Sequence, residues 1–232
     1  MNEQSLQTFS GLAGSGSLAA DRNRVLRNTY WLLALSMVPT VLGAWIGVTT
    51  GITQALGSGM SAIVFLGGAF GFMYAIEKTK DSSTGVYVLL AFTFFMGLML
   101  ARMLSAVLGF KNGSSLVMTA FGGTAMVFFG MATLASVIKR DLSGMGKFLF
   151  VGALILMVAS IVNIFMHSSA MMLTISVLAI VIFSGFILFD IKRVIDGGET
   201  NYISATLAIY LSVYNVFQSL LAILGIVGGE RD

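Results

Sequence analysis

Residues 175–190 read ISVLAIVIFSGFILFD, and this stretch decides what kind of protein the chain is. Fifteen uncharged residues precede Asp190, and the apolar character extends back to residue 171. A helix that crosses the hydrocarbon core of a bilayer needs about 20 apolar residues. Residues 171–189 are therefore predicted to form a transmembrane helix.

Six further stretches, on both sides of this one, have the same length and character. The seven predicted spans are residues 30–48, 60–76, 86–108, 116–138, 148–166, 171–189 and 205–227. The connections between them are short, so consecutive helices are expected to be antiparallel neighbours. The sequence predicts an all-α, polytopic membrane protein in which residues 24–232 form a seven-transmembrane-helix bundle.

The composition excludes several other classes of protein. Of the 232 residues, 57% are hydrophobic and only 10% are charged, against about 25% charged in an ordinary soluble domain. A cytosolic enzyme, a nucleic-acid-binding protein and a disordered protein all need more polar surface than this. The chain has no Cys and one His, which excludes a thiol nucleophile and disfavours a zinc site. We expect no cofactor and no nucleic-acid partner.

The distribution of Lys and Arg predicts the orientation of the bundle. Ten of the 13 basic residues fall before the first span or in every second connection: Arg22, Arg24, Arg27, Lys78, Lys80, Lys139, Arg140, Lys147, Lys192 and Arg193. Cytoplasmic loops carry an excess of Lys and Arg. The N-terminus is therefore predicted to be cytoplasmic and the C-terminus periplasmic, and the net charge of +3 reflects topology.

The first 23 residues have a different character. Met1 to Ala20 show no apolar periodicity, and residues 11–17 are rich in Gly and Ser. Such a segment cannot bury enough apolar surface to offset the entropy lost on ordering. Residues 1–23 are predicted to be a flexible cytoplasmic tail.

Small residues recur at the spacing that allows helices to approach closely in lipid. Gly43 and Gly47 are four residues apart, as are Gly67 and Gly71. Ordinary packing of the bundle is the expected role of both pairs.

Polar side chains form three rows within the predicted spans: Ser160, Asn163 and His167; Ser212, Asn215 and Ser219; and Tyr210, Tyr214 and Gln218. Residues at these spacings share one face of a helix. Polar groups in a membrane helix usually face the bundle interior. The rows are interpreted either as the lining of a hydrated cavity or as interhelical hydrogen bonds that hold the bundle together.

Two charged residues within or at the end of spans are candidates for function. Asp190 ends its apolar run, so its carboxylate is expected to be partly desolvated and to serve as a gate or cation site. The alternative is a local pair with Arg193, three residues later. Arg102 lies inside the third span, where it is either an internal ion-pair partner or extends to the membrane surface.

The connection between the last two spans carries further polar residues. Asp196, Glu199 and Asn201 surround the pair Gly197 and Gly198. Glu199 and Asn201 are placed to contact a partner or a cation. A plain turn followed by a cap for the last helix accounts for the same residues.

Three segments resemble a known family. Residues 192–225, KRVIDGGETNYISATLAIYLSVYNVFQSLLAILG, resemble the C-terminal signature of the Bax inhibitor-1 family. Residues 24–37, RVLRNTYWLLALSM, and 121–129, FGGTAMVFF, are similar to its bacterial YccA-like branch. The resemblance runs from about residue 24 to residue 225 and implies a seven-helix bundle in the bacterial inner membrane.

The resemblance implies two functions. The YccA-like branch is associated with FtsH, a membrane-anchored ATP-dependent protease. Members of this branch bind the protease and restrain it. FtsH and its associated membrane regulators are therefore the expected partners. Pore-type relatives are pH-sensitive calcium leaks closed by two aspartates. Asp190 matches the first aspartate, but Ser212 stands at the position of the second. A shared-proton pair is therefore not available, and a calcium pathway would rest on Asp190 alone.

No HExxH, GxSxG or phosphate-binding loop occurs in the sequence. The chain is accordingly expected not to be an enzyme. Modulation of the protease is the first hypothesis, and a pH-sensitive calcium or cation leak gated around Asp190 is the alternative.

Overall fold

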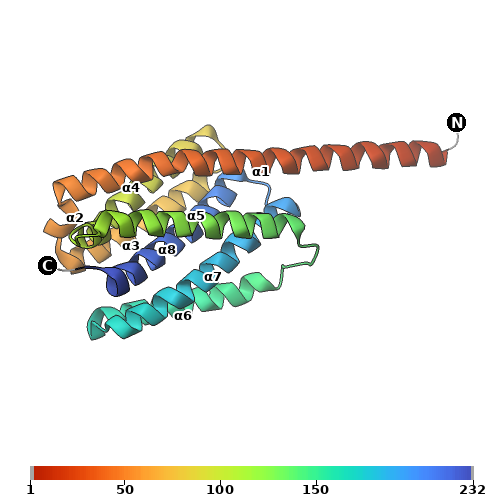
Figure 1. Cartoon of the computed structure of the whole chain (residues 1–232). Coiled ribbons are helices and arrows are strands. Elements are labelled where there is room, and N and C mark those ends of the chain that lie inside the picture. Colours follow the sequence, from red (N-terminus) through yellow and green to blue (C-terminus); the bar gives the residue numbers. More distant parts are fainter. Residues whose placement is uncertain (1–2, 231–232) are drawn as a thin grey trace.

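The computed structural model describes residues 3–230, and within them the side chains of residues 20–57 and 59–230. Its helices are α1 (Glu3–Thr50), α2 (Ile52–Ala55), α3 (Gly57–Thr79), α4 (Ser83–Leu108), α5 (Gly113–Val137), α6 (Met145–Met166), α7 (Ser169–Ile195) and α8 (Tyr202–Gly228) (Figure 1). All except the one-turn helix α2 are long and apolar enough to cross a membrane. The predicted seven-helix, all-α class is confirmed.

The connections alternate between the two ends of the bundle. Those between α3 and α4, α5 and α6, and α7 and α8 lie at the end from which α1 projects, and α8 finishes at the opposite end (Figure 1). We call the end from which α1 projects the basic end, because the ten basic residues identified above cluster there. The side of the membrane that each end faces stays a prediction of the Lys and Arg distribution.

Helix α8 lies at the centre of the bundle. It contacts α7, α5, α1, α4 and α3, and its Ile203, Ile209, Val216 and Leu221 side chains are fully buried. Helix α6 is peripheral: among the described helices it packs only against α7. Its Phe148 and Phe165 are 78% and 80% exposed, as expected for a helix that faces lipid on most sides.

Helices α1 and α4 approach each other closely through glycine. A Cβ on Gly43 of α1 would overlap the carbonyl oxygen of Phe94, and a Cβ on Gly97 of α4 would overlap that of Thr40. Only glycine lets two helix backbones come this near. The packing role predicted for Gly43, and for Gly47 one turn later against Ala101, is confirmed.

The same prediction is wrong for Gly67 and Gly71 of α3. A Cβ built on either residue meets no atom within 4 Å, and both glycines lie on a face of α3 that no other described helix covers. The spacing alone therefore does not identify the interface.

The N-terminal segment continues the first membrane helix. Residues 3–23 belong to α1 and are helical, and the flexibility expected of residues 1–23 stays a prediction. Nucleation is the costly step in helix formation, whereas extending an existing helix costs little. The long apolar part of α1 supplies the nucleus, so its Gly- and Ser-rich N-terminal side continues the helix. Met1 and Asn2 lie outside the described residues, as do Arg231 and Asp232 at the C-terminus.

Candidate functional site

Asp190 lies on the bundle side of α7, near the basic end. It is half-buried and precedes the end of the helix at Ile195 by five residues. Ile187, three residues before it, and Val194, four residues after it, share its helical face and are 0% and 1% exposed. The carboxylate is therefore held at the edge of the hydrophobic core, within the membrane-spanning part of α7.

Among the described residues, the local ion pair between Asp190 and Arg193, which was the alternative interpretation of Asp190, does not form. Arg193 directs its guanidinium to the following turn: Nη2 lies 3.4 Å from Glu199 Oε2, and Nε donates to the carbonyl oxygen of Gly198 at 3.2 Å. Among the described residues no hydrogen bond or ion pair satisfies the Asp190 carboxylate.

Lys192 and Asp196 form a second ion pair, beside that of Arg193 and Glu199. Lys192 is 8% exposed, and its Nζ donates to Asp196 Oδ1 at 2.6 Å, one turn further along α7. Hydrogen bonds from the Ser143 hydroxyl and backbone N–H are the main reason that the pKa of Asp141, in the α5–α6 connection, lies below its usual range. The positive charge of Lys192 also contributes to lowering the pKa of Asp141. Asp196, the residue that follows the last residue of α7, thus has a structural partner on that helix.

Asn201 connects two turns at the basic end. Its Oδ1 accepts hydrogen bonds from the backbone N–H groups of Ile203 and Ser204, which caps α8. Its Nδ2 donates to the carbonyl oxygen of Lys80 and to Oδ1 of Asp81, both at 2.9 Å. The interpretation of this segment as a turn with a helix cap is confirmed, and the same side chain also joins the α7–α8 connection to the α3–α4 connection.

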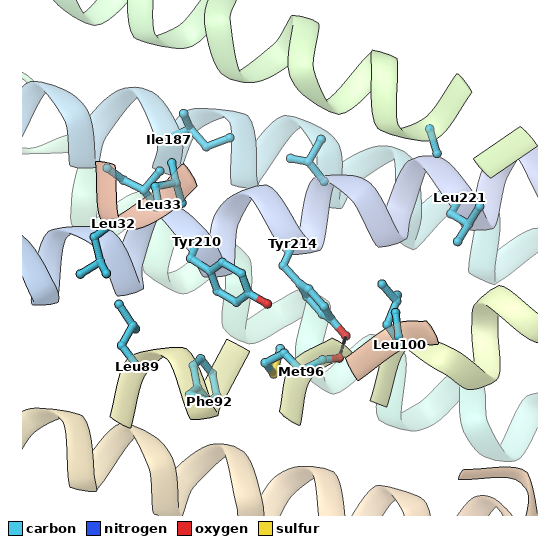
Figure 2. Packing of buried hydrophobic residues seen from close by; sticks show 14 of the residues in the cluster. Leu32, Leu33, Leu89, Phe92, Met96, Leu100, Ile187, Tyr210, Tyr214 and Leu221 are labelled. Atoms are coloured by element: carbon cyan, nitrogen blue, oxygen red, sulfur yellow. Dashed lines mark hydrogen bonds between the residues drawn. The ribbon is translucent and has the colours of Figure 1, made fainter. Parts of the chain in front are cut away.

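The tyrosine row of α8 makes interhelical hydrogen bonds. The Tyr210 hydroxyl lies 2.9 Å from Thr40 Oγ1 of α1. The Tyr214 hydroxyl donates to the carbonyl oxygen of Met96 on α4 at 3.1 Å (Figure 2), and Gln218 Nε2 donates to Tyr214 at 3.3 Å. Of the two interpretations, interhelical hydrogen bonding is the one that this row supports.

Ser212 and Asn215 make hydrogen bonds within their own helix. Ser212 Oγ donates to the carbonyl oxygen of Ala208 at 3.1 Å, and Asn215 Nδ2 donates to that of Leu211 at 2.8 Å. Helices α7 and α8 are in extended contact, but no hydrogen bond joins either residue to Asp190 among the described residues. A cation site at Asp190 and a hydrated cavity lined by the row that contains Ser212 and Asn215 both stay predictions.

The other polar candidates lie toward the opposite end. Asn163 Oδ1 accepts from the backbone N–H of Ser168 at 3.1 Å and so stabilises the α6–α7 turn. His167 ends α6 with a positive φ of 51°. Arg102 is exposed near the far end of α4. The structure therefore brings Asp190, Arg193, Asp196 and Glu199 together at the basic end, and separates them from Asn163 and Arg102.

Metal binding finds no support in this arrangement. Among the described residues, no three His, Cys, Asp or Glu side chains come together in a way that could hold a metal ion. Calcium at Asp190 stays an expectation drawn from the family resemblance.

Comparison with known proteins decides the family. The model of the family described as "Inhibitor of apoptosis-promoting Bax1" matches residues 22–229, which include every span of the bundle. The chain belongs to the Bax inhibitor-1 family. The predicted resemblance, drawn from residues 24–37, 121–129 and 192–225, is thereby confirmed.

Proteins of several bacteria are similar to this chain over nearly its whole length. An uncharacterized membrane protein of Vibrio cholerae is 40% identical over 211 residues, 90% of this chain and 92% of its own length. An Escherichia coli K12 protein named "Modulator of FtsH protease YccA" is 39% identical over 203 residues, 88% of this chain and 90% of its own. An uncharacterized protein of Pseudomonas aeruginosa is 36% identical over 230 residues.

The chain is therefore a multi-pass inner-membrane protein. Seven spans and the match to a protein also named "Inner membrane protein YccA" in a second Escherichia coli strain support this location, as the sequence predicts.

Sequence reasoning missed two contacts of this Bax inhibitor-1 protein. The hydrogen bonds from Asn201 to Lys80 and Asp81 join residues that are 121 and 120 positions apart in the sequence. The cap signal at Asn201 does not reveal them. The contact between Thr40 and Tyr210 crosses 170 residues. A hydroxyl in a span indicates that a partner is needed, but it does not say which helix supplies that partner.

Proposed function

We propose that this chain binds an FtsH-type membrane protease and restrains its attack on other membrane proteins. The observation that carries the proposal is the 39% identity, over 88% of the chain, to a protein named as a modulator of that protease. The similarity covers 88% of this chain and 90% of that protein.

The arrangement of α1 supports the proposal. Its N-terminal part projects from the bundle at the basic end (Figure 1), which the Lys and Arg distribution predicts to be cytoplasmic. A protease that pulls on its substrates needs an accessible end, and this helical extension is such an end. The bundle behind it is costly to extract, because every helix removed from lipid exposes apolar surface to water. An accessible end on a body that resists unfolding makes a slow substrate, which occupies the protease.

Two measurements test the proposal. Tagged protein is isolated from native membranes and its partners are identified by mass spectrometry; we expect the protease to co-purify. In proteoliposomes that contain the purified protease, adding this protein is expected to slow degradation of a labelled membrane substrate. An unrelated seven-helix protein at the same concentration is the control. Failure to co-purify, or slowing by the control to the same extent, contradicts the proposal.

A second candidate function is a cation leak at Asp190. The observation that favours it is a half-buried carboxylate in a membrane span that lacks a hydrogen bond or ion pair among the described residues. Calcium flux into proteoliposomes tests it directly. Asp190→Asn is expected to abolish the flux, whereas Asp196→Asn, a change in the neighbouring ion pair, is expected to leave it unchanged. If the calcium flux does not exceed that of empty vesicles, this function is ruled out.

A further inference from the structure

A groove runs along the outside of the bundle between α1 and α5. The backbones of these two helices are not in contact in the described part of the chain, and α8 closes the bottom of the groove with Val213. The groove has a volume of about 640 Å³ and is almost entirely apolar. Ala34, Ala125 and Ala132 are among its lining residues, and their short side chains create the space. We call this feature the α1–α5 groove.

The shape of the groove suits a narrow, flexible chain. Tyr30 and Phe128, one from each wall, make an edge contact with their ring centroids 6.1 Å apart, so the walls meet within the groove. A helix with its side chains is about 10–12 Å wide and does not fit between walls that touch. Phe121 and Ser136 bound the groove along α5, a length of about 22 Å at the helical rise. That exceeds the hydrocarbon thickness of one leaflet, about 15 Å, so a whole acyl chain can lie in it.

Three exposed cations lie at the basic end of the groove. Arg27 precedes Tyr30 by one helical turn on α1, and Lys139 and Arg140 follow directly after α5. All three are exposed, and none has an ion-pair partner within residues 20–230. The neighbouring carboxylate of Asp141 accepts hydrogen bonds from Ser143 in its own loop. We call Arg27, Lys139 and Arg140 the basic rim.

We propose that the α1–α5 groove binds an anionic phospholipid from the leaflet at the basic end. One acyl chain lies along the groove between the alanines of α1 and α5, and the phosphate lies on the basic rim. Basic pockets between transmembrane helices recognise anionic headgroups in this way, because the cations attract the phosphate while the apolar walls hold the chain. The proposal is independent of the protease and of any ion pathway.

Native mass spectrometry of the purified protein tests the headgroup contact. The protein is titrated with phosphatidylglycerol, or with phosphatidylcholine of the same acyl chains. The double variant Arg27→Gln/Arg140→Gln is expected to bind phosphatidylglycerol about 25-fold more weakly, because each basic residue near the surface contributes about fivefold to the affinity. The control Lys78→Gln/Lys147→Gln removes two exposed charges away from the groove and is expected to bind like the wild type. Equal affinities for the two double variants would overturn the proposal.

A second pair of variants tests the acyl-chain contact. Ala125→Phe fills the groove and is expected to weaken phosphatidylglycerol binding with the basic rim intact. Met126→Phe, at an adjacent residue that is 73% exposed and does not line the groove, is expected to have no effect. Because the chain contains no cysteine, Ala125→Cys offers a clean site for crosslinking. An efficient disulfide between two copies in membranes would show that another protein chain occupies the groove, and would overturn the proposal.

Discussion

Asn201 has two structural roles, and its position before α8 indicates only the first of them, the helix cap. Its side-chain oxygen Oδ1 caps α8, while its side-chain nitrogen Nδ2 donates hydrogen bonds to the α3–α4 connection. Replacement by Ala removes both contributions, and replacement by Ser keeps the cap but cannot reach the carbonyl of Lys80. We expect Asn201→Ala to lower the free energy of unfolding by about 2–3 kcal/mol and Asn201→Ser by about 1 kcal/mol. Unfolding with a denaturing detergent in mixed micelles measures both. Equal losses for the two variants would show that the cap contributes nothing.

At the scale of helices, two glycines that look alike in the sequence have different surroundings. Gly97 lies against the α1 backbone, whereas Gly71 faces open space. Changing either to Ala brings the same gain in helix propensity, about 1 kcal/mol, but only Gly97→Ala forces α1 and α4 apart. We expect Gly97→Ala to lower the free energy of unfolding by about 1–3 kcal/mol, and Gly71→Ala to leave it unchanged or slightly higher. Thermal unfolding in detergent compares them. A loss for Gly71→Ala as large as that for Gly97→Ala would contradict the interface.

The same pair of glycines shows which features of the fold can be predicted from the sequence and which cannot. Each span is readable because the bilayer imposes one rule on length and polarity along the chain. Which face of a span meets which neighbour is not readable, because lipid and protein interior are both apolar and hydrophobicity does not distinguish them. For this reason the seven spans and the half-burial of Asp190 are predictable. The pairing of Arg193 with Glu199 instead of Asp190, and the reach of Asn201 across the basic end, are not.

For the whole molecule, the alternating connections lead to a test of orientation. An enzyme reporter that is active only outside the cytoplasm is fused either after Asp232 or within the α5–α6 connection. We expect activity from the first fusion and none from the second, because seven spans place the termini on opposite sides and Lys139, Arg140 and Lys147 mark the cytoplasmic side. The converse reporter, active only in the cytoplasm, should give the opposite pattern. Activity from the α5–α6 fusion outside the cytoplasm would reverse the topology.

The projecting part of α1 leads to a test of the proposed function at the same scale. Deleting residues 1–20 is expected to leave the bundle folded, since the apolar part of α1 and its contacts with α4 are intact, and to prevent degradation by the protease. Pulse-chase of the full-length and truncated proteins, in cells with active or inactivated protease, measures this. Equal half-lives of the two proteins in cells with active protease would show that this segment is not where the protease engages.

The close approach of α1 and α4 also has a mechanical consequence. A force applied to the N-terminal end of α1 acts along the helix axis, so it loads the glycine-lined seam with α4 in shear. Many backbone contacts must then slip together, whereas a force that peels the helix sideways would break them one after another. The contact between Thr40 and Tyr210 lies beside this seam and ties α1 to the central helix as well. Extraction from this end therefore begins by shearing the seam between α1 and α4, and a motor that pulls there would be slowed before the remaining helices come under load.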